Sequence, residues 1–313
     1  MRPTLALAAA TVLAAGTLGT AHADDGTAHQ AASTAAGPRA AAAATSIGQV
    51  GAGDCGINGP AAVVINTQAA GVPSYVAPSN GVLTSFSHQA NFKAGKIQAV
   101  VFADGATATQ KTVVAKSTKL TVTVNQLNTF AIRLPVKAGQ RLGLGYSAKD
   151  MACATTGGTG DATLVKTPFD PDAASAFVAD GVLSQGNLTF RPNISAVLEP
   201  DADADGFGDV TQDACPRSAL TTAVCPEPDT TITKKPKHPR THTKVKVKVK
   251  FTASMAGSTF ECRLDGHQKW KPCTSPYQRW LGVGPHRLQV RAVSPVGIPD
   301  PRPAKVKFTI SRS

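Results

Sequence analysis

Aromatic residues are scarce in this chain of 313 residues, which has two tryptophans and three tyrosines. Sugar-binding surfaces usually expose several aromatic rings, and sequence-tolerant nucleic-acid platforms stack successive bases on the same residue types. Both tryptophans, Trp270 and Trp280, lie in the last third of the chain, and before them only Tyr75 and Tyr146 accompany the phenylalanines. The composition therefore disfavours a nucleic-acid platform anywhere and a sugar platform in the first two thirds.

The motifs of common enzymes are also missing. The seven histidines lack zinc-ligand spacing, and there is no P-loop, dinucleotide fingerprint or serine nucleophile elbow. Four aspartates that could serve as catalytic acids, Asp104, Asp161, Asp170 and Asp172, fall in expected loops and are paired by no motif, so we interpret them as turn residues. We expect His88 to be a partly buried strand residue. The sequence thus predicts a protein that is not an enzyme.

Sustained apolar sequence is confined to the first residues. Residues 1–23 combine Arg2, an apolar run and the ending Ala21-His22-Ala23, a pattern typical of a secretory signal peptide. Residues 24–45 are of low complexity, and we expect a flexible leader there. No later run approaches the roughly 20 apolar residues that cross a bilayer, so we expect an extracellular protein without a transmembrane segment.

Short β-rich runs separated by Gly, Pro, Asn and Asp fill residues 46–198. They are AAVVINT, GVLTSFSHQ, IQAVVFA, KLTVTV, TFAIRLPV, RLGLGY and NISAVLE. Alternating polarity in GVLTSFSHQ and KLTVTV indicates half-buried strands. Helical periodicity is almost absent, which favours an all-β sandwich. The segment LPVKAGQRLGLGY resembles a strand-turn-strand unit of exported jelly-roll domains, and this resemblance implies a jelly-roll-like fold.

Six cysteines in an exported chain indicate disulfide bonds. Six cysteines allow 15 connectivities. The order along the chain favours pairing within each segment: Cys55 with Cys153, Cys215 with Cys225, and Cys262 with Cys273.

Five carboxylates crowd the stretch DADADGFGDVTQD, residues 201–213. Because like charges this close repel one another, the arrangement suggests a bound cation. The spacing follows a calcium loop with oxygen ligands at alternate positions and a glycine at position 6. The predicted ligands are Asp201, Asp203, Asp205, the carbonyl of Phe207, Asp209 and Asp213. The last acid comes one residue later than in an EF-hand.

Helices do not flank this loop, since Pro200 precedes it and DACP ends it. The core DxDxDGxGD, followed by Asp213 and Cys215, resembles a thrombospondin type 3 repeat. That resemblance implies calcium as the bound ion and residues 199–226 as a calcium-binding linker, although this chain has one repeat where the family usually has several. The alternative is an acidic, solvated linker.

Basic charge is concentrated in residues 227–313, which carry a net charge of +13. The rest of the chain carries a net charge of −1, so the whole chain has +12. The segments PDTTI, GSTFECRLDG and PCTSPY resemble immunoglobulin-like or fibronectin type III-like repeats of secreted actinobacterial proteins. The resemblance implies a C-terminal immunoglobulin-like sandwich that acts as a spacer or adhesion unit and has no catalytic residues.

Lysines alternate with apolar residues in KVKVKVKF, so that Lys244, Lys246, Lys248 and Lys250 share one strand face. Further basic residues, Lys234, Lys235, Lys237 and Arg240, precede this ladder. The ladder indicates contact with an anionic cell-surface polymer or polysaccharide; the alternative is that lysines protect an edge strand from pairing.

Together these features predict an all-β protein with an N-terminal jelly-roll-like sandwich, a calcium-binding linker and a basic immunoglobulin-like module. We expect a secreted or cell-wall-associated, non-enzymatic, adhesive or structural protein. A carbohydrate-binding protein acting through the N-terminal sandwich is the alternative. A secreted hydrolase, with a site assembled from residues far apart in sequence, is the third.

Overall fold

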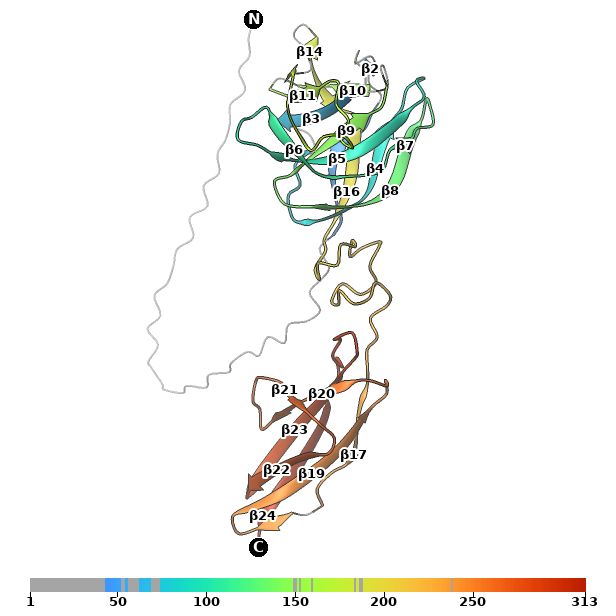
Figure 1. Ribbon diagram of the computed structural model, residues 1–313. Coiled ribbons are helices and arrows are strands. Elements are labelled where there is room, and N and C mark those ends of the chain that lie inside the picture. Colours follow the sequence, from blue (N-terminus) through green and yellow to red (C-terminus); the bar gives the residue numbers. More distant parts are fainter. Residues whose placement is uncertain are drawn as a thin grey trace, which may run out of the picture. The chain divides into compact units, whose positions relative to one another are not determined.

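A computed structural model describes residues 43–51, 54–55, 62–68, 74–148, 151, 153–158, 160–182, 184–185, 188–237 and 239–313. The predicted signal peptide and nearly all of the predicted leader lie outside these residues. The described chain is all-β and contains no helix (Figure 1). The prediction of an all-β fold is therefore confirmed. No part of the described chain forms a helix that could span a bilayer.

Within the residues that the structure describes, sixteen strands precede the acidic loop. They are β1 (Thr45–Gln49), β2 (Asp54–Cys55), β3 (Ala62–Gln68), β4 (Gly81–Gln89), β5 (Lys96–Asp104), β6 (Gln110–Lys116), β7 (Leu120–Thr121), β8 (Leu127–Val136), β9 (Arg141–Tyr146), β10 (Cys153–Thr156), β11 (Ala162–Lys166), β12 (Ala176–Val178), β13 (Gly181–Val182), β14 (Ser184–Gln185), β15 (Leu188–Pro192) and β16 (Ile194–Glu199).

These strands form two main sheets and a smaller one. One sheet has the order β1-β16-β4-β8, and the largest has the order β12-β6-β5-β9-β3-β11-β13, with β7 beside β5. The small sheet has the order β14-β15-β10-β2. The first strand, β1, thus pairs antiparallel with the last, β16, with Thr45 opposite Leu198.

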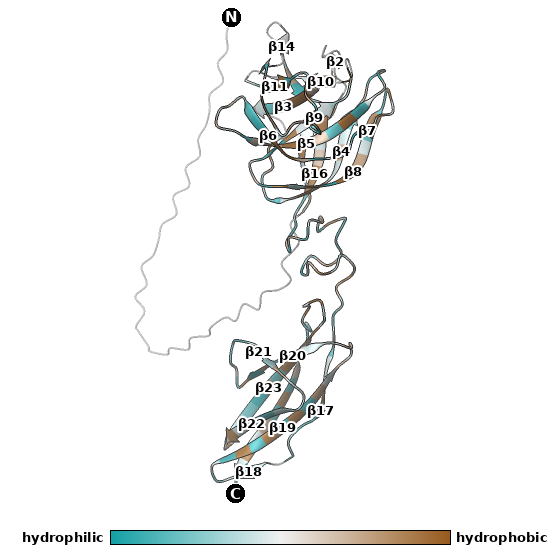
Figure 2. Ribbon diagram, in the orientation of Figure 1, coloured by the Kyte–Doolittle hydropathy of each residue, from teal (hydrophilic) through white to brown (hydrophobic). Residues whose placement is uncertain are grey.

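The main core lies between the two large sheets, where Phe86 of β4 and Leu198 of β16 meet Val64 of β3 and Val101 of β5. Neighbouring residues of β3 and β5 point the other way, into a second cluster with Phe169 and Phe177. Because both faces of these strands are buried, they need continuous apolar runs rather than alternation. Figure 2 shows these hydrophobic residues along β3 and β5.

Most predicted strands form, but KLTVTV does not form the long strand that its alternation indicated. Only Leu120–Thr121 pair with β5, and the chain turns at Asn125, which has a φ of 58°. Asn128 accepts a bond from the Thr123 backbone and donates to its carbonyl, so a side chain takes the place of a strand partner. Polar turn chemistry overrides the period-two pattern here.

Eight strands form the described part of the C-terminal module. They are β17 (Thr230–Lys234), β18 (Arg240–Thr241), β19 (Lys244–Ala253), β20 (Thr259–Leu264), β21 (Lys271–Cys273), β22 (Tyr277–Gly282), β23 (Gly284–Val293) and β24 (Ala304–Arg312). The sheet orders are β17-β19-β22 and β18-β24-β23-β20-β21. Val249 and Phe251 of β19 pack against Leu288 and Val290 of β23, so the core lies between the two sheets.

Two of the predicted disulfides are present, Cys215–Cys225 and Cys262–Cys273. Cys153 is also disulfide-bonded, and its ladder partner in β2 is Cys55. The side chain of Cys55 lies outside the described residues, so the third pairing stays a prediction.

Candidate metal site and basic surface

Three aspartates of the acidic loop converge. Carboxylate oxygens of Asp201, Asp203 and Asp205 all lie within 4.8 Å of one another, and all three side chains are half-buried. Alternate spacing alone would separate these side chains in an extended strand, so the loop must curl to bring them together. Residues 200–229 contain no strand.

Backbone hydrogen bonds hold the curl. Asp201 accepts bonds from the N–H groups of Asp205 and Gly206, both at 3.1 Å, and Asp205 accepts one from Phe207 at 2.8 Å. Gly206 has a φ of 86°, a conformation that side chains rarely adopt, at the position where the pattern requires glycine. These hydrogen bonds between aspartate side chains and nearby backbone N–H groups therefore hold the carboxylates close together.

Two further aspartates, Asp209 and Asp213, are more deeply buried and interact electrostatically with this cluster. Asp213 is 4% exposed, and its Oδ2 is buried with no hydrogen-bond partner within the described chain; Oδ2 of Asp203 is in the same condition. Burial raises the pKa of Asp209, and the charges of Asp201, Asp203 and Asp213 raise it further. Burial, followed by the charge of Asp205, likewise raises the pKa of Asp203.

A buried carboxylate oxygen without a donor is costly. A cation between the carboxylates would satisfy these oxygens and remove the repulsion at once. The donor set consists only of oxygens, which suits a hard cation, and its many flexible carboxylates suit calcium better than magnesium. Of the predicted ligands, Asp201, Asp203 and Asp205 thus converge, whereas Asp209 and Asp213 lie outside this group and interact with it electrostatically. The Phe207 carbonyl belongs to the same loop.

The loop is fastened to the sandwich by a residue that the sequence did not single out. Glu199, the last residue of β16, is completely buried and accepts hydrogen bonds from Thr84, Val210 and Thr211. Burial alone would raise the pKa of Glu199, but these hydrogen bonds hold it below its ordinary value. The carboxylate is therefore ionised and serves as a fixed anchor at neutral pH.

Two contacts with β8 add to this anchor. The side-chain amide of Gln212 donates to the carbonyl of Ile132 at 2.8 Å. The guanidinium of Arg133 lies 4.1 Å from the centre of the Phe207 ring. Farther along, the hydroxyl of Ser218 donates to the carbonyl of Val296, which connects the segment after the loop to the C-terminal module.

The lysine ladder lies where the alternation placed it. Lys244, Lys246, Lys248 and Lys250 are exposed on β19, whereas Val247, Val249 and Phe251 between them are buried. Lys234 ends the neighbouring strand β17, and Lys235 and Lys237 follow it. Arg240 is not brought to the ladder by strand pairing, since it begins β18 in the other sheet.

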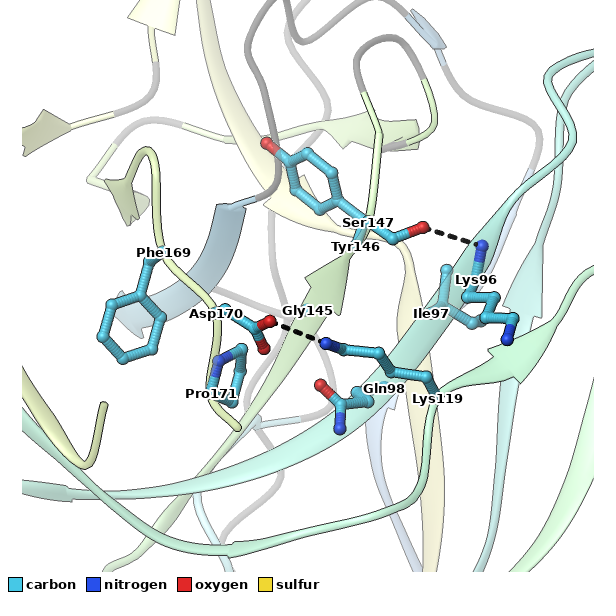
Figure 3. Close-up of a pocket in the computed structure, with 10 residues that line it drawn as sticks. All are labelled: Lys96, Ile97, Gln98, Lys119, Gly145, Tyr146, Ser147, Phe169, Asp170 and Pro171. Carbon is cyan, nitrogen blue, oxygen red and sulfur yellow. Dashed lines mark hydrogen bonds and ion pairs between the residues drawn. The ribbon is translucent and has the colours of Figure 1, made fainter. Parts of the chain in front are cut away.

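The N-terminal sandwich contains a pocket of about 120 Å³ beside β5 and β9. Two of its three charged groups are paired with each other, since Lys119 lies 2.7 Å from Asp170, and Lys96 is the third. Figure 3 shows the Tyr146 hydroxyl pointing away from that ion pair, and burial raises the Tyr146 pKa to about 12. Tyr75 and Tyr146 are both buried, so neither ring offers a sugar platform.

Asp161, Asp104 and His88, which were also considered as acids or bases, already have ion-pair or hydrogen-bond partners. Asp161 is buried and lies 2.6 Å from Arg191, and Asp104 pairs with Lys111 and Arg141. His88 is buried rather than partly buried, its Nδ1 lies 2.7 Å from the carbonyl of Asn193, and burial lowers its pKa.

Comparison with known proteins leaves the chain without a family. No protein-family model matches it, and no curated protein matches it. Among solved structures, the extracellular domain of BT4673 from B. thetaiotaomicron, assigned to the one-component systems, is similar over 67% of this chain and 30% of that chain. The identity is 8% and the TM-score 0.24, so this chain spans less than a third of that structure and the likeness carries no functional argument.

Proposed function

We propose that this chain is an extracellular, non-enzymatic calcium-binding protein. In this proposal the acidic loop 201–213, which resembles a thrombospondin type 3 repeat, binds calcium and stiffens the connection between the sandwich and the basic module. The module contacts anionic polymers of a cell surface, which gives the protein an adhesive or structural role. Disulfide bonds support an oxidising, extracellular location.

One observation carries the calcium site. Asp213 is nearly fully buried, yet one of its carboxylate oxygens has no donor within the described chain while the other accepts the Cys215 N–H at 2.7 Å. A solvated acidic linker would leave its carboxylates in water, where they need no partner. An unpartnered buried oxygen on a residue whose charge acts on Asp203 and Asp209 is instead expected of a ligand.

The joint role follows from how the loop is attached. Its contacts with the sandwich run through Glu199, Gln212 and Phe207, and its segment toward the module runs through Ser218. Without an ion, repulsion among the aspartates opposes this folded loop and favours an extended linker. With the ion, the charges are neutralised and the same contacts become cooperative.

Calorimetric titration of calcium into the secreted chain tests the proposal. Extracellular modules bind calcium with dissociation constants of about 10⁻⁴ to 10⁻³ M, so we expect saturable heat in that range. The triple variant Asp201→Asn, Asp203→Asn, Asp205→Asn should lose it. Asparagine keeps an acceptor oxygen for the backbone bonds that these aspartates receive, so loss of binding would not reflect loss of the curl.

Asp229→Asn is the matched control, because Asp229 is an exposed carboxylate outside the cluster. It should bind calcium as the unaltered chain does. Small-angle scattering with and without calcium then tests the stiffening, and we expect compaction only where calcium binds. Absence of heat up to about 10 mM calcium would reduce the loop to a solvated linker and contradict the proposal.

A further inference from the structure

The outer face of the sheet β17-β19-β22 carries positive charge without compensation. Lys234 of β17 lies directly opposite Lys250 of β19 in the ladder. Like charges directly opposite destabilise a sheet. Protection of an edge does not explain this pair, because β19 is the central strand of the sheet and needs none.

The module's own acids do not neutralise these lysines. Glu227 pairs with Arg217, Glu261 with Arg291 and Asp265 with His286. Asp300 accepts backbone N–H groups of Thr230 and Arg302, and Asp229 forms no ion pair within the described chain. Within the described chain, no ion pair or hydrogen bond involves the ammonium groups of Lys234, Lys235, Lys237 or the β19 lysines. The charge is therefore available to an external anion.

Part of this charge lines a groove. The segment after β17 runs beside β19, and together they line an open groove of about 380 Å³. The lining residues are Lys234, Lys235, Pro236, Lys237, Pro239, Lys246, Val247 and Lys248, with no acidic residue among them. The prolines restrict the backbone of the wall, so the lysines are held on a relatively rigid frame.

An exposed aromatic ring lies on the other side of β19, opposite a lysine that lines the groove. Trp280 of β22 lies directly opposite Lys246 and is therefore on the same outer face. The Trp280 side chain is 63% exposed. The other tryptophan, Trp270, has Arg263 and Arg291 over its ring at 4.5 and 4.4 Å, whereas no ring or cation contact to Trp280 exists within the described chain.

Lysines beside the exposed indole ring of Trp280 match a ligand made of sugar rings that carry anionic groups. The faces of a sugar ring present C–H groups that pack on an aromatic ring, while anionic substituents meet the ammonium groups. A nucleic-acid strand would require several rings for successive bases. We propose that this face, from the groove across Lys246 to Trp280, binds an acidic polysaccharide, with one sugar ring stacked on Trp280.

This inference rests on the proposed contact with anionic polymers and names its site and its ligand class. The anionic groups could be carboxylates or phosphates, so both are tested. Binding of the full secreted chain to hyaluronan, which carries carboxylates, and to a phosphomannan, which carries phosphates, is measured at several salt concentrations. Inorganic polyphosphate supplies charge without sugar, uncharged dextran supplies sugar without charge, and oligo(dT) supplies single-stranded DNA.

We expect at least one acidic polysaccharide to bind with strongly salt-dependent affinity, and dextran not to bind. Trp280→Ala should weaken the polysaccharide about tenfold and leave polyphosphate within about twofold. Lys246→Gln with Lys248→Gln should weaken both by about tenfold. Lys305→Gln with Lys307→Gln, which removes equal charge from exposed positions of β24, should change affinity by less than about twofold.

The outcomes separate this inference from the proposal beneath it. If no anionic polymer binds, both the polymer contact and this inference fail. If polyphosphate binds as tightly as the polysaccharides and Trp280→Ala affects them equally, the polymer contact stands and the polysaccharide inference is overturned. Tighter binding of oligo(dT) than of either polysaccharide, or an equal effect of the β24 variant, also overturns it. Because Trp280 is exposed, its replacement should leave thermal stability unchanged.

Discussion

Thr211 donates to both oxygens of the Glu199 carboxylate, from its backbone N–H at 2.8 Å and from its hydroxyl at 2.7 Å. Glu199 is the last residue of the sandwich, and Thr211 lies two residues after Asp209, the fourth aspartate of the acidic loop. This pair closes the loop onto the strand that leads into it. The folding of the sandwich and the shape of the metal site are thereby coupled.

Replacement of Glu199 by Gln should lower the stability of the sandwich and weaken calcium binding by the acidic loop. The amide keeps one acceptor oxygen but turns an N–H₂ group toward buried donors, which removes charge-assisted hydrogen bonds. We expect a loss of about 2 kcal/mol in the free energy of unfolding of the sandwich, measured by urea denaturation without calcium, and weaker calcium binding. Glu227→Gln, which breaks the exposed ion pair with Arg217, should cost less than about 1 kcal/mol. Equal costs for the two variants would show that Glu199 is no anchor.

Gly208→Ala tests the close approach of the loop to the sandwich. A Cβ at this position would lie 2.5 Å from Glu199 Oε2 and from the Thr84 Cγ2. The loop must therefore move away, and we expect calcium affinity to fall while the core of the sandwich stays folded by circular dichroism. Gly181→Ala, where a Cβ meets nothing within 4 Å, is the control and should leave calorimetric affinity unchanged. An unaltered affinity in Gly208→Ala would mean that the site does not depend on this packing.

Asp213→Asn should have opposite effects with and without calcium. Without the ion, the substitution removes a buried negative charge from a repelling cluster, so thermal stability in a chelator should rise. With 10 mM calcium, a site of extracellular affinity stabilises the folded chain by about 1.4 to 2.7 kcal/mol, and the variant should lose most of this gain. Differential scanning calorimetry in both buffers gives the comparison. If Asp213→Asn is less stable than the unaltered chain in the chelator, Asp213 Oδ2 is not a cation ligand.

The C-terminal module should lose stability above neutral pH through His286. Burial alone would lower the His286 pKa, but Asp265 at 2.7 Å and the Gly282 carbonyl at 3.0 Å accept from the protonated ring and hold its pKa above the ordinary value. A raised folded-state pKa means that this stabilisation is complete below the unfolded-state value and disappears as pH rises through the folded-state value.

The difference in stability between the unaltered chain and His286→Asn should therefore be largest near pH 5.5 and shrink toward pH 8.5. Its size should stay within about 1 kcal/mol, as for partly exposed ion pairs. Gln268→Asn, which alters an exposed side chain that does not titrate, should give no pH-dependent difference. A gap that widens with pH would rule out the His286–Asp265 pair as its cause.

The sequence predicted what depends on local pattern. β4 coincides with GVLTSFSHQ, and β19 contains the lysine ladder on one face, because alternation directly reports a strand with one buried side. The acidic spacing likewise anticipated the convergence of Asp201, Asp203 and Asp205. Pattern failed at KLTVTV, where Asn128 supplies bonds that no alternation reveals.

What the sequence did not reveal depends on contacts between distant residues. Glu199 looks like an ordinary acid before a proline, and its burial follows from Thr84, which lies 115 positions earlier in the chain. The pairing of Lys234 with Lys250 and of Lys246 with Trp280 depends on register across strands, which a single strand does not encode. These partners were therefore accessible only from the fold.

The pairing of β1 with β16 has a mechanical consequence. Thr45 lies opposite Leu198 and Gln49 opposite Ile194, so the chain enters and leaves this strand pair at the same end. Tension applied between residues before Thr45 and residues after Glu199 would load the hydrogen bonds one after another, as in opening a zipper, rather than all together in shear. Under pulling force the sandwich would yield gradually from this end, and the Glu199–Thr211 contact would be among the first to bear the load.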